Sequence, residues 1–532
     1  MYHAPMTTRQ RSLLGGISIL GIAGLICKVV GVLYRIPLAN SIGSEGIGVY
    51  QQVFPTYNLM LTVSSAGIPV AISRMVSFRV ARGQHRAAGQ VFRIAMYLLV
   101  IAGLASTAAM AGLRSSLARA AGTPESAAGF LYIAPSLLFV CIMSAYRGYM
   151  QGHRRMVPTA ISQLIEQVGK VAVALPLAYR FMLSGGYAMG AAGALLGTTI
   201  AEAVAMLYMA VDYHFVRPGL YAGVPAEAGP PESRRAVARE LVFSAVPITI
   251  GACIVPLAGA VDSFMLVRLM QRYLEPAEAL SRYGIYSGLV IALINVPTAL
   301  AMATAASLVP SISARRAAGD EAGIRRDASA GLRLSMVIGL PGSVGMSLLA
   351  QPILALLFGG GKYSPEQLAL GGSLLQVSSL TIVVFTLVQA TSGILQGLYL
   401  QRIPMYTLML GVGLKVAINY AAVRIPSVSI FGAPWASLVC YAVSAALNLY
   451  YVARHARLRF DLKELLLRPS LATLAMALPV ALAAHFLGNR LQRSWPLMGI
   501  VLAGAVVIYV AAALRTGAVK TTELPGRLRR GH

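Results

Sequence analysis

The sequence predicts an all-α integral membrane protein with about fourteen membrane-spanning helices, and three observations indicate this class. Of 532 residues, 57% are hydrophobic and only 12% are charged, whereas soluble domains carry about 25% charged residues. The mean hydropathy is +0.70. The apolar segments are about 20 residues long, which is the length that crosses the core of a bilayer.

Fourteen segments meet this length criterion. Their approximate limits are 12–36, 48–73, 88–113, 129–152, 158–182, 187–213, 241–267, 284–314, 328–357, 366–397, 403–423, 430–453, 469–488 and 495–514. An even number of spans places both termini on one side of the membrane. Segments on that side hold 27 of the 44 Lys and Arg residues, against 10 on the other side. The positive-inside rule therefore predicts cytoplasmic termini and a multi-pass protein of the cell membrane.

The net charge of +26 fits the same class. In a soluble protein it would suggest nucleic acid, which we do not expect as a partner here. Basic loops on the cytoplasmic side are attracted to anionic membrane lipids.

The spans divide into two halves around a Pro-rich, charged loop. We expect an N-terminal lobe of six helices at residues 1–213, a cytoplasmic linker at 214–240 and a second six-helix lobe at 241–456. Two further helices occupy 457–515, and a basic cytoplasmic tail follows at 516–532.

An internal repeat supports this division. Gln151-Gly152 and Lys170-Val171-Ala172 recur 245 residues later as Gln396-Gly397 and Lys415-Val416-Ala417. Because an even number of spans separates the copies, the lobes should be parallel repeats related by a pseudo-twofold axis along the membrane normal. At the same offset Arg147 is replaced by Ser392 and Glu166 by Gly411. Arg147 and Glu166 are therefore candidates for a task specific to the first half.

Three segments carry a resemblance to a known family: KVVGVLYRIPLANSIGSEGIGVYQ (28–51), AGIPVAISRMV (66–76) and AYRGYMQGHRRMVPTAISQLIEQVGKV (145–171). They resemble the polysaccharide-transporter branch of the multidrug/oligosaccharidyl-lipid/polysaccharide (MOP) exporter superfamily. The chain looks similar to the SpoVB-like sporulation proteins, which are relatives of the MurJ lipid II flippases.

The resemblance implies an alternating-access flippase for an undecaprenyl-pyrophosphate-linked glycan, such as a peptidoglycan precursor for spore cortex or cell wall. It also implies cavity-facing basic residues in the first two spans. Lys28 and Arg35 fit the first-span pattern approximately, whereas Leu59–Thr62 in the second span holds no arginine. No catalytic residue, metal site or cofactor is expected, and the protein is expected to be a monomer. A coupling ion, Na⁺ or H⁺, is left open.

The cations of the first span have two interpretations. An ionisable side chain within a span costs roughly 2.5–3.5 kcal/mol, so it requires a partner, water or an interface. Lys28 lies about 16 residues into its span, roughly 24 Å from the cytoplasmic end, and Arg35 lies near the outer end. They either bind a pyrophosphate in a cavity or reach the outer interface.

A second polar group surrounds the turn between spans four and five. Glu166 and Lys170 are four residues apart on one helix face and can form an ion pair. The turn at Pro158 brings Arg147 back towards Glu166. The three residues form either a coupling network or a structural one. Glu202, near the middle of span six, is either a proton- or cation-responsive carboxylate or a hydrogen-bonded acid between helices.

Prolines interrupt several spans, and Pro55, Pro69, Pro256 and Pro297 are candidate gating hinges. The alternative is that these prolines produce fixed kinks, because a proline can bend a helix permanently without acting as a hinge.

Two other functions remain open. A multidrug antiporter of the same superfamily would use cavity-facing acids, and span one holds cations instead. A membrane glycosyltransferase or ligase would use catalytic carboxylates in a large outer loop. The longest outer loop, about 268–283, offers only Glu275 and Glu278.

Overall fold

The computed structural model describes residues 8–221, 232–458 and 460–519, and within these ranges every regular element is helical. Parts of the predicted linker (222–231) and of the predicted basic tail (520–532) lie outside the described residues. The chain folds as two compact units. Unit 1 runs to Gln271 and includes Glu275–Gly284; unit 2 contains Arg272–Leu274 and the chain from Ile285 onward.

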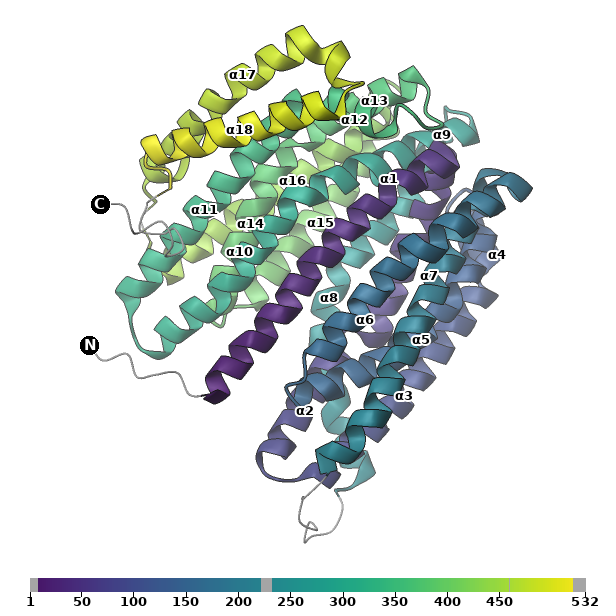
Figure 1. Cartoon of the computed structure of the whole chain (residues 1–532), viewed down its shortest axis with the longest axis vertical. Helices are drawn as coiled ribbons and strands as arrows, with labels where there is room; N and C mark the ends of the chain where they lie inside the picture. Colours follow the sequence, from purple (N-terminus) through teal and green to yellow (C-terminus); the bar gives the residue numbers. More distant parts are fainter. Residues whose placement is uncertain (1–7, 222–231, 459, 520–532) are drawn as a thin grey trace. The chain divides into compact units, whose positions relative to one another are not determined.

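The described part of unit 1 contains nine α-helices and two short helical segments (Figure 1). These are α1 (Thr8–Ser65), α2 (Gly67–Ala81), α3 (His85–Gly112), α4 (Arg114–Ala120), η1 (Pro124–Ser126), α5 (Ala127–Gly152), α6 (Val157–Gly169), the π-helix η2 (Lys170–Ala174), α7 (Leu175–Tyr221), α8 (Arg234–Met270) and α9 (Pro276–Gly284).

Two helices of unit 1 are interrupted by glycines. In α1, Gly43 has φ 75°, and in α7, Gly186 also has φ 75°. Residues with a side chain rarely adopt this left-handed conformation, so glycine allows a break there. The breaks fall between predicted spans one and two and between predicted spans five and six.

Twelve helices of the described chain are long and apolar enough to cross a membrane, and two of these cover 56 and 64 residues. At 1.5 Å per residue each of the two would measure more than about 80 Å, against a bilayer core of about 30 Å. Each is therefore long enough to cross twice, with the interrupting glycine between the crossings. The chain is a helical membrane protein, and the count of fourteen crossings stays a prediction.

Helix α8 packs along α1 and α2. Gly67 at the start of α2 donates its backbone N–H to Thr249 Oγ1 of α8 at 3.1 Å, and a Cβ on Gly67 would overlap the backbone of Ala245. The glycine therefore permits the close approach of the two helices. Packing thus groups α8 with unit 1, whereas the sequence repeat groups it with the second half. The lobe boundaries remain a prediction, because packing and repeat symmetry are different criteria.

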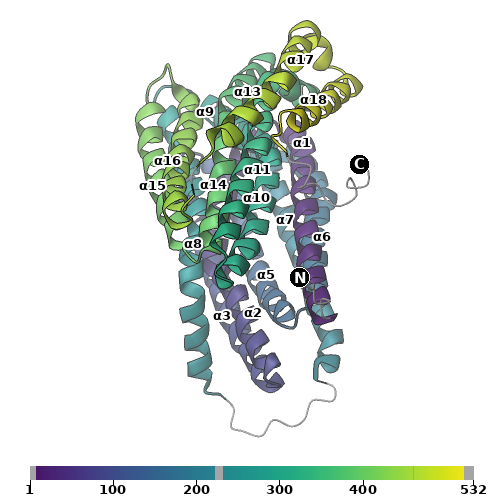
Figure 2. The same ribbon diagram turned by 90° about the vertical axis from the view of Figure 1, so that its left-hand side faces the viewer.

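The described part of unit 2 contains nine α-helices and three short helical segments (Figure 2). These are the π-helix η3 (Ile285–Val290), α10 (Ile291–Ala317), α11 (Glu321–Leu348), α12 (Ala350–Phe358), α13 (Pro365–Ser378), α14 (Leu380–Gly397), α15 (Arg402–Ala422), η4 (Ser429–Phe431), α16 (Gly432–His455), the π-helix η5 (Lys463–Leu467), α17 (Arg468–Leu491) and α18 (Trp495–Arg515).

Helices α17 and α18 pack side by side, as the yellow ribbons of Figure 1 show. Two polar contacts attach this pair to α11. Arg333 Nη1 of α11 lies 3.0 Å from Glu464 Oε2, and Glu464 also pairs with Arg468 at the start of α17. Tyr509 of α18 donates its hydroxyl to the carbonyl of Val337 at 2.7 Å.

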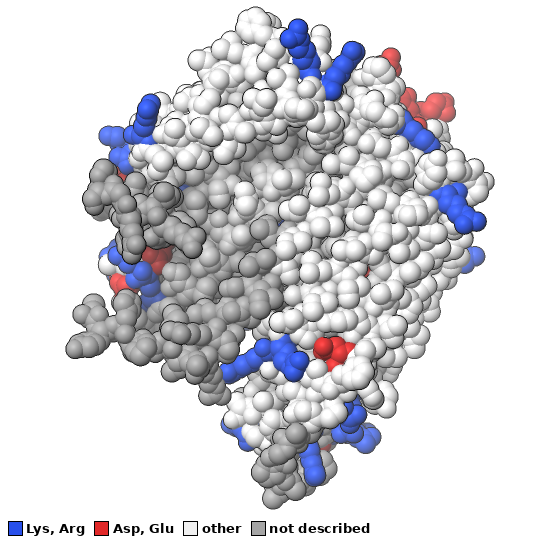
Figure 3. Space-filling model, viewed as in Figure 1, with Lys and Arg blue, Asp and Glu red and all other residues white. Residues whose placement is uncertain are grey.

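Charge is unevenly distributed over the surface of the described chain. On the face shown in Figure 3, Lys, Arg, Asp and Glu side chains lie near helix ends, and the surface between them is largely uncharged. Large apolar side chains are exposed on the helices of unit 1, including Tyr97 of α3 (72%) and Leu183 of α7 (70%). A soluble protein would bury such a surface, so it is suited to lipid.

Candidate functional site

The charged residues of the α5–α6 turn meet in space. Arg147, near the end of α5, donates from Nε to Ser162 Oγ at 2.9 Å. Its Nη2 lies 3.1 Å from Glu166 Oε2 of α6. The turn that allows this contact contains Arg154 with φ 63°, and Pro158 occupies the first turn of α6, where its missing N–H costs nothing. The contact predicted between Arg147 and Glu166 is therefore formed.

Glu166 also carries the second predicted ion pair. Lys170 Nζ lies 3.5 Å from Glu166 Oε1, and the side chains of Arg147, Glu166 and Lys170 are only 13–17% exposed. Lys170 begins the π-helix η2, a form of helix that often occurs at functional sites. One carboxylate thus pairs with two cations, so these three residues together retain one net positive charge.

Glu202 of α7 lies close to a different partner. The residue is 3% exposed, and the Tyr57 hydroxyl of α1 is 3.1 Å from Oε1 and 3.0 Å from Oε2. Tyr57 is fully within the core, with 2% exposure. A buried carboxyl group needs such a donor, because an unpaired polar atom in a dry interior is costly.

Tyr50 connects these groups to the first half of α1. Its buried side chain is within electrostatic range of Arg35, Lys170 and Glu202. Lys170 and Glu202 also lie within electrostatic range of each other. Five charged residues from α1, α5, α6, η2 and α7 thus surround one region of unit 1. We call this set, Arg35, Arg147, Glu166, Lys170 and Glu202, the polar cluster.

Lys28 lies at the edge of the polar cluster. Its neighbour Cys27 is within electrostatic range of Glu166, Lys170 and Arg147. One turn further along, a Cβ on Gly31 would lie 3.6 Å from Gln167 Oε1 of α6, so α1 approaches α6 closely here. The Lys28 side chain itself is exposed.

The positions in unit 2 that are equivalent to Arg147 and Glu166 carry no charge, whereas Lys170 recurs as Lys415. Ser392, at the position of Arg147, accepts a hydrogen bond from Asn448 Nδ2 at 3.5 Å, and Asn448 Oδ1 accepts one from Thr407. Gly411, at the position of Glu166, lets α15 approach Cys440 of α16. Uncharged hydrogen bonds and close packing thus replace the ion pairs, which supports a task specific to the first half.

The candidate hinges occupy different settings. Pro55 lies inside α1, Pro256 inside α8 and Pro297 inside α10. Pro69 is instead the third residue of α2, directly after the chain bends between α1 and α2. Their role as gating hinges remains a proposal.

The uncharged residues that complete the polar cluster could not be identified from the sequence. Tyr57, Tyr50 and Ser162 lie on apolar helices, where hydroxyl side chains are common, so nothing in their spacing distinguished them. Among the described residues no group of three or more His, Cys, Asp or Glu side chains is arranged to hold a metal ion.

Comparison with known proteins places this fold and this sequence in one family. The model of the polysaccharide biosynthesis protein family matches residues 13–315, and the MatE model matches residues 247–421. The chain is 24% identical to the lipid II flippase MurJ of Bacillus subtilis (strain 168) over 98% of both chains. It is 23% identical to stage V sporulation protein B of the same organism over 86% of both chains.

Two solved structures share the fold. An inward-facing multidrug resistance MATE family transporter of the MOP superfamily has a TM-score of 0.68, with 16% identity, over 83% of this chain and 98% of its own. The lipid II flippase MurJ in an inward closed conformation has a TM-score of 0.69, with 12% identity, over 94% of this chain and 98% of its own. This chain belongs to the polysaccharide biosynthesis protein family.

Proposed function

We propose that this protein is an alternating-access flippase that moves a polyprenyl-pyrophosphate-linked glycan across the cell membrane. The observation that carries the proposal is the similarity to a lipid II flippase over 98% of both chains. The similarity to a stage V sporulation protein supports a cell-wall or spore-cortex precursor as the glycan. In this proposal the protein is a monomer with cytoplasmic termini, and it translocates its substrate without catalysing a reaction on it.

Lys28 and Arg35 are the proposed pyrophosphate ligands. Both lie on α1, and the Lys28 side chain is exposed rather than packed in the core. A lysine ammonium suits diphosphate oxygens as a point charge, and an arginine fork binds them in pairs. The net positive charge that Arg147 and Lys170 leave beside Glu166 would further favour an anionic substrate.

The buried acids are the proposed coupling elements. Glu166 is held by two cations and Glu202 by a neutral hydroxyl, so the two carboxylates have different environments. Binding of H⁺ or Na⁺ at Glu202 would change the charge of the cluster by one unit. Such a change next to Lys170 alters how strongly the region holds an anion.

Substitution of both α1 cations tests the substrate role. We expect Lys28→Ala with Arg35→Ala to abolish translocation of lipid-linked precursor in membrane vesicles, because the pyrophosphate loses both ligands. Arg93→Ala is the matched control, since Arg93 is an exposed cation on a different apolar helix, α3. Full activity of the double variant, at wild-type protein level, would eliminate Lys28 and Arg35 as ligands.

A multidrug antiporter is the second candidate, because the MatE model matches residues 247–421 and a MATE transporter shares the fold. Cationic drugs require an available carboxylate, yet Glu166 is already paired with two internal cations. Efflux of a cationic dye by the purified protein, without glycan-lipid transport, would favour the antiporter.

A further inference from the structure

The α17–α18 pair of unit 2 forms a hairpin with an exposed apolar surface. The exposed apolar side chains run along both helices: Leu474 (64%), Leu478 (67%), Phe486 (75%), Ile500 (67%), Val506 (61%) and Val507 (67%). A helix pair of this length and composition belongs in lipid. The short connection between α17 and α18 must therefore lie near a surface of the bilayer.

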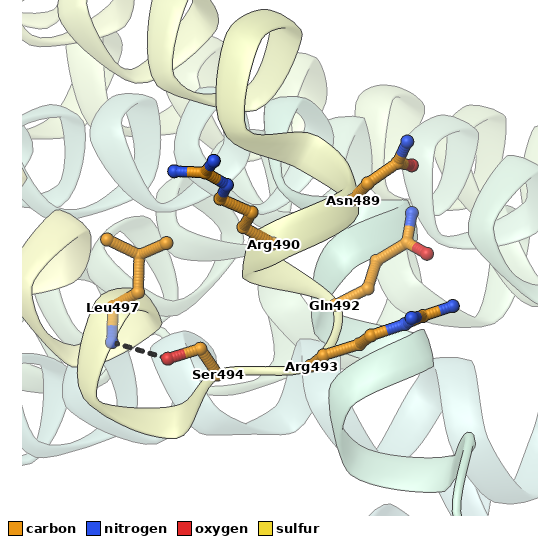
Figure 4. Close-up of a pocket in the computed structure, with 6 residues that line it drawn as sticks. All are labelled: Asn489, Arg490, Gln492, Arg493, Ser494 and Leu497. Atoms are coloured by element: carbon orange, nitrogen blue, oxygen red, sulfur yellow. Dashed lines mark hydrogen bonds between the residues drawn. The ribbon is translucent and has the colours of Figure 1, made fainter.

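That connection contains a polar pocket of about 640 Å³. Figure 4 shows its lining, which is Asn489, Arg490, Gln492, Arg493, Ser494 and Leu497. In the figure Asn489, Gln492 and Arg493 extend towards one side of the connection, and Arg490 extends towards another. Ser494 faces the start of α18, where its Oγ accepts the N–H of Leu497 at 3.4 Å.

The positive charge of this pocket is not neutralised by the hairpin. No Asp or Glu occurs between Glu464 and Glu523, and among the described residues neither Arg490 nor Arg493 forms an ion pair. Arg468, at the other end of the same hairpin, does pair with an acid, Glu464. The predicted topology also puts this connection on the outer side, where the positive-inside rule makes arginine uncommon.

The pocket also lies beside a membrane-interface anchor. Trp495 follows directly after Ser494 and is 61% exposed. Tryptophan is enriched where the hydrocarbon meets the headgroups, because its ring is apolar and its N–H is polar. The guanidinium groups next to it therefore lie at the depth of lipid phosphates.

We propose that the α17–α18 pocket binds the phosphate of a membrane lipid, with an anionic phospholipid as its resident ligand. Arginine presents a fork of N–H donors that matches phosphate oxygens, and the amides of Asn489 and Gln492 supply further donors to the headgroup. The ligand would hold the hairpin at a fixed depth in the membrane. The pocket is separate from the polar cluster of unit 1 and does not depend on the proposed function.

The chain offers its own reporter for this site, since it contains two tryptophans, Trp435 and Trp495. In full-length protein carrying Trp435→Phe, Trp495 is the only tryptophan, and excitation at a wavelength that tyrosine does not absorb isolates its emission. The protein is placed in phosphatidylcholine nanodiscs that contain increasing fractions of phosphatidylglycerol with brominated acyl chains, which quench nearby tryptophan. A parallel series uses brominated phosphatidylcholine. We expect the anionic lipid to quench at a lower mole fraction.

Arg490→Gln with Arg493→Gln should lower this preference about 25-fold, because each arginine at an anionic surface contributes about a fivefold factor. The control, Arg402→Gln with Arg424→Gln, removes the same charge from exposed positions at the two ends of α15. Equal quenching by both lipids in the unsubstituted pocket would overturn the proposal. The proposal would also be overturned if the control variant lost its preference for the anionic lipid to the same extent, because that result would indicate only a general attraction of basic residues to an anionic bilayer.

Competition identifies the source of the phosphate. Relief of quenching by millimolar inorganic phosphate would assign a soluble-anion site and contradict the lipid assignment. Relief by a polyprenyl pyrophosphate, but not by inorganic phosphate, would assign the site to the lipid phosphate of the transported substrate and contradict a resident phospholipid. Relief by neither would assign the site to a resident membrane phospholipid, as we expect.

Discussion

At the scale of single residues, Glu166 is the counter-ion on which two buried cations depend. Glu166→Ala leaves Arg147 and Lys170 without their acid in a site that is 13–17% exposed. We expect a loss of about 3 kcal/mol in stability, because breaking a buried ion pair leaves an uncompensated charge. Thermal unfolding in detergent measures it.

A variant that lacks all three charges distinguishes an effect of the ion pairs on stability from an effect on translocation. Arg147→Met, Glu166→Leu and Lys170→Met together remove the charges and keep similar volumes, so the stability should return to near that of the native protein. Wild-type translocation by this triple variant would show that the ion pairs only stabilise the helices. Loss of translocation in a stable triple variant would support the coupling role.

Tyr57 is the second residue with a predicted effect. Tyr57→Phe removes the hydroxyl that lies within hydrogen-bond distance of both oxygens of Glu202. It should cost about 1 kcal/mol, the net contribution of one hydrogen bond, because Ser136 remains as a hydrogen-bond partner of Glu202. Adding Glu202→Leu to Tyr57→Phe should recover part of that loss, since the carboxyl group that lost one of its two donors is then gone. Equal thermal midpoints for Tyr57→Phe and the native protein would contradict the role assigned to this hydrogen bond.

At the scale of secondary-structure elements, the start of α8 is held against α2 by one buried arginine. Arg79 of α2 is 5% exposed and pairs with Glu232 at 2.6 Å and Glu240 at 3.1 Å. Gln90 of α3 donates to the carbonyl of Glu232 at 2.6 Å. The C-terminal part of the predicted linker is therefore attached to α2 and α3 of unit 1 by these contacts.

Removing the arginine of this contact should cost less stability than removing its two glutamates. Arg79→Met leaves carboxylates that are 40% and 47% exposed and can be hydrated, so it should cost only about 1 kcal/mol. Glu232→Ala with Glu240→Ala leaves the buried guanidinium without an acid and should cost about 3 kcal/mol. Hydrogen exchange over residues 232–245 reports the difference, and equal exchange in both variants would contradict this asymmetry.

At the scale of the whole molecule, the prediction of fourteen crossings depends on the chain turning back at the two glycine breaks, Gly43 and Gly186. If α1 and α7 each cross twice, Ser184 beside the α7 break lies outside and Gln84 lies inside. Both side chains are exposed. In a variant whose four native cysteines are alanine, Ser184→Cys should react with an impermeant maleimide in intact cells, and Gln84→Cys should react only after permeabilisation. Labelling of both from the same side would rule out the fourteen-span topology.

The sequence by itself determined the class of the protein and part of its site. Long apolar segments predict membrane helices directly, because the cost of exposing a backbone to lipid leaves few alternatives. The contact between Glu166 and Lys170 followed from helical spacing, and that with Arg147 followed from a short turn. These are local relations, which sequence separation alone is enough to specify.

Only the tertiary structure decided which distant residues meet. Tyr57 and Glu202 are 145 positions apart, and Arg79 and Glu232 are 153 apart; no periodicity relates them. The grouping of α8 with α1 and α2 likewise depends on the close approach that Gly67 permits, which is a property of two packed surfaces. Apolar patterning determines that a helix lies in the membrane, whereas the side-chain shapes and polar pairs between helices determine which helix lies beside it.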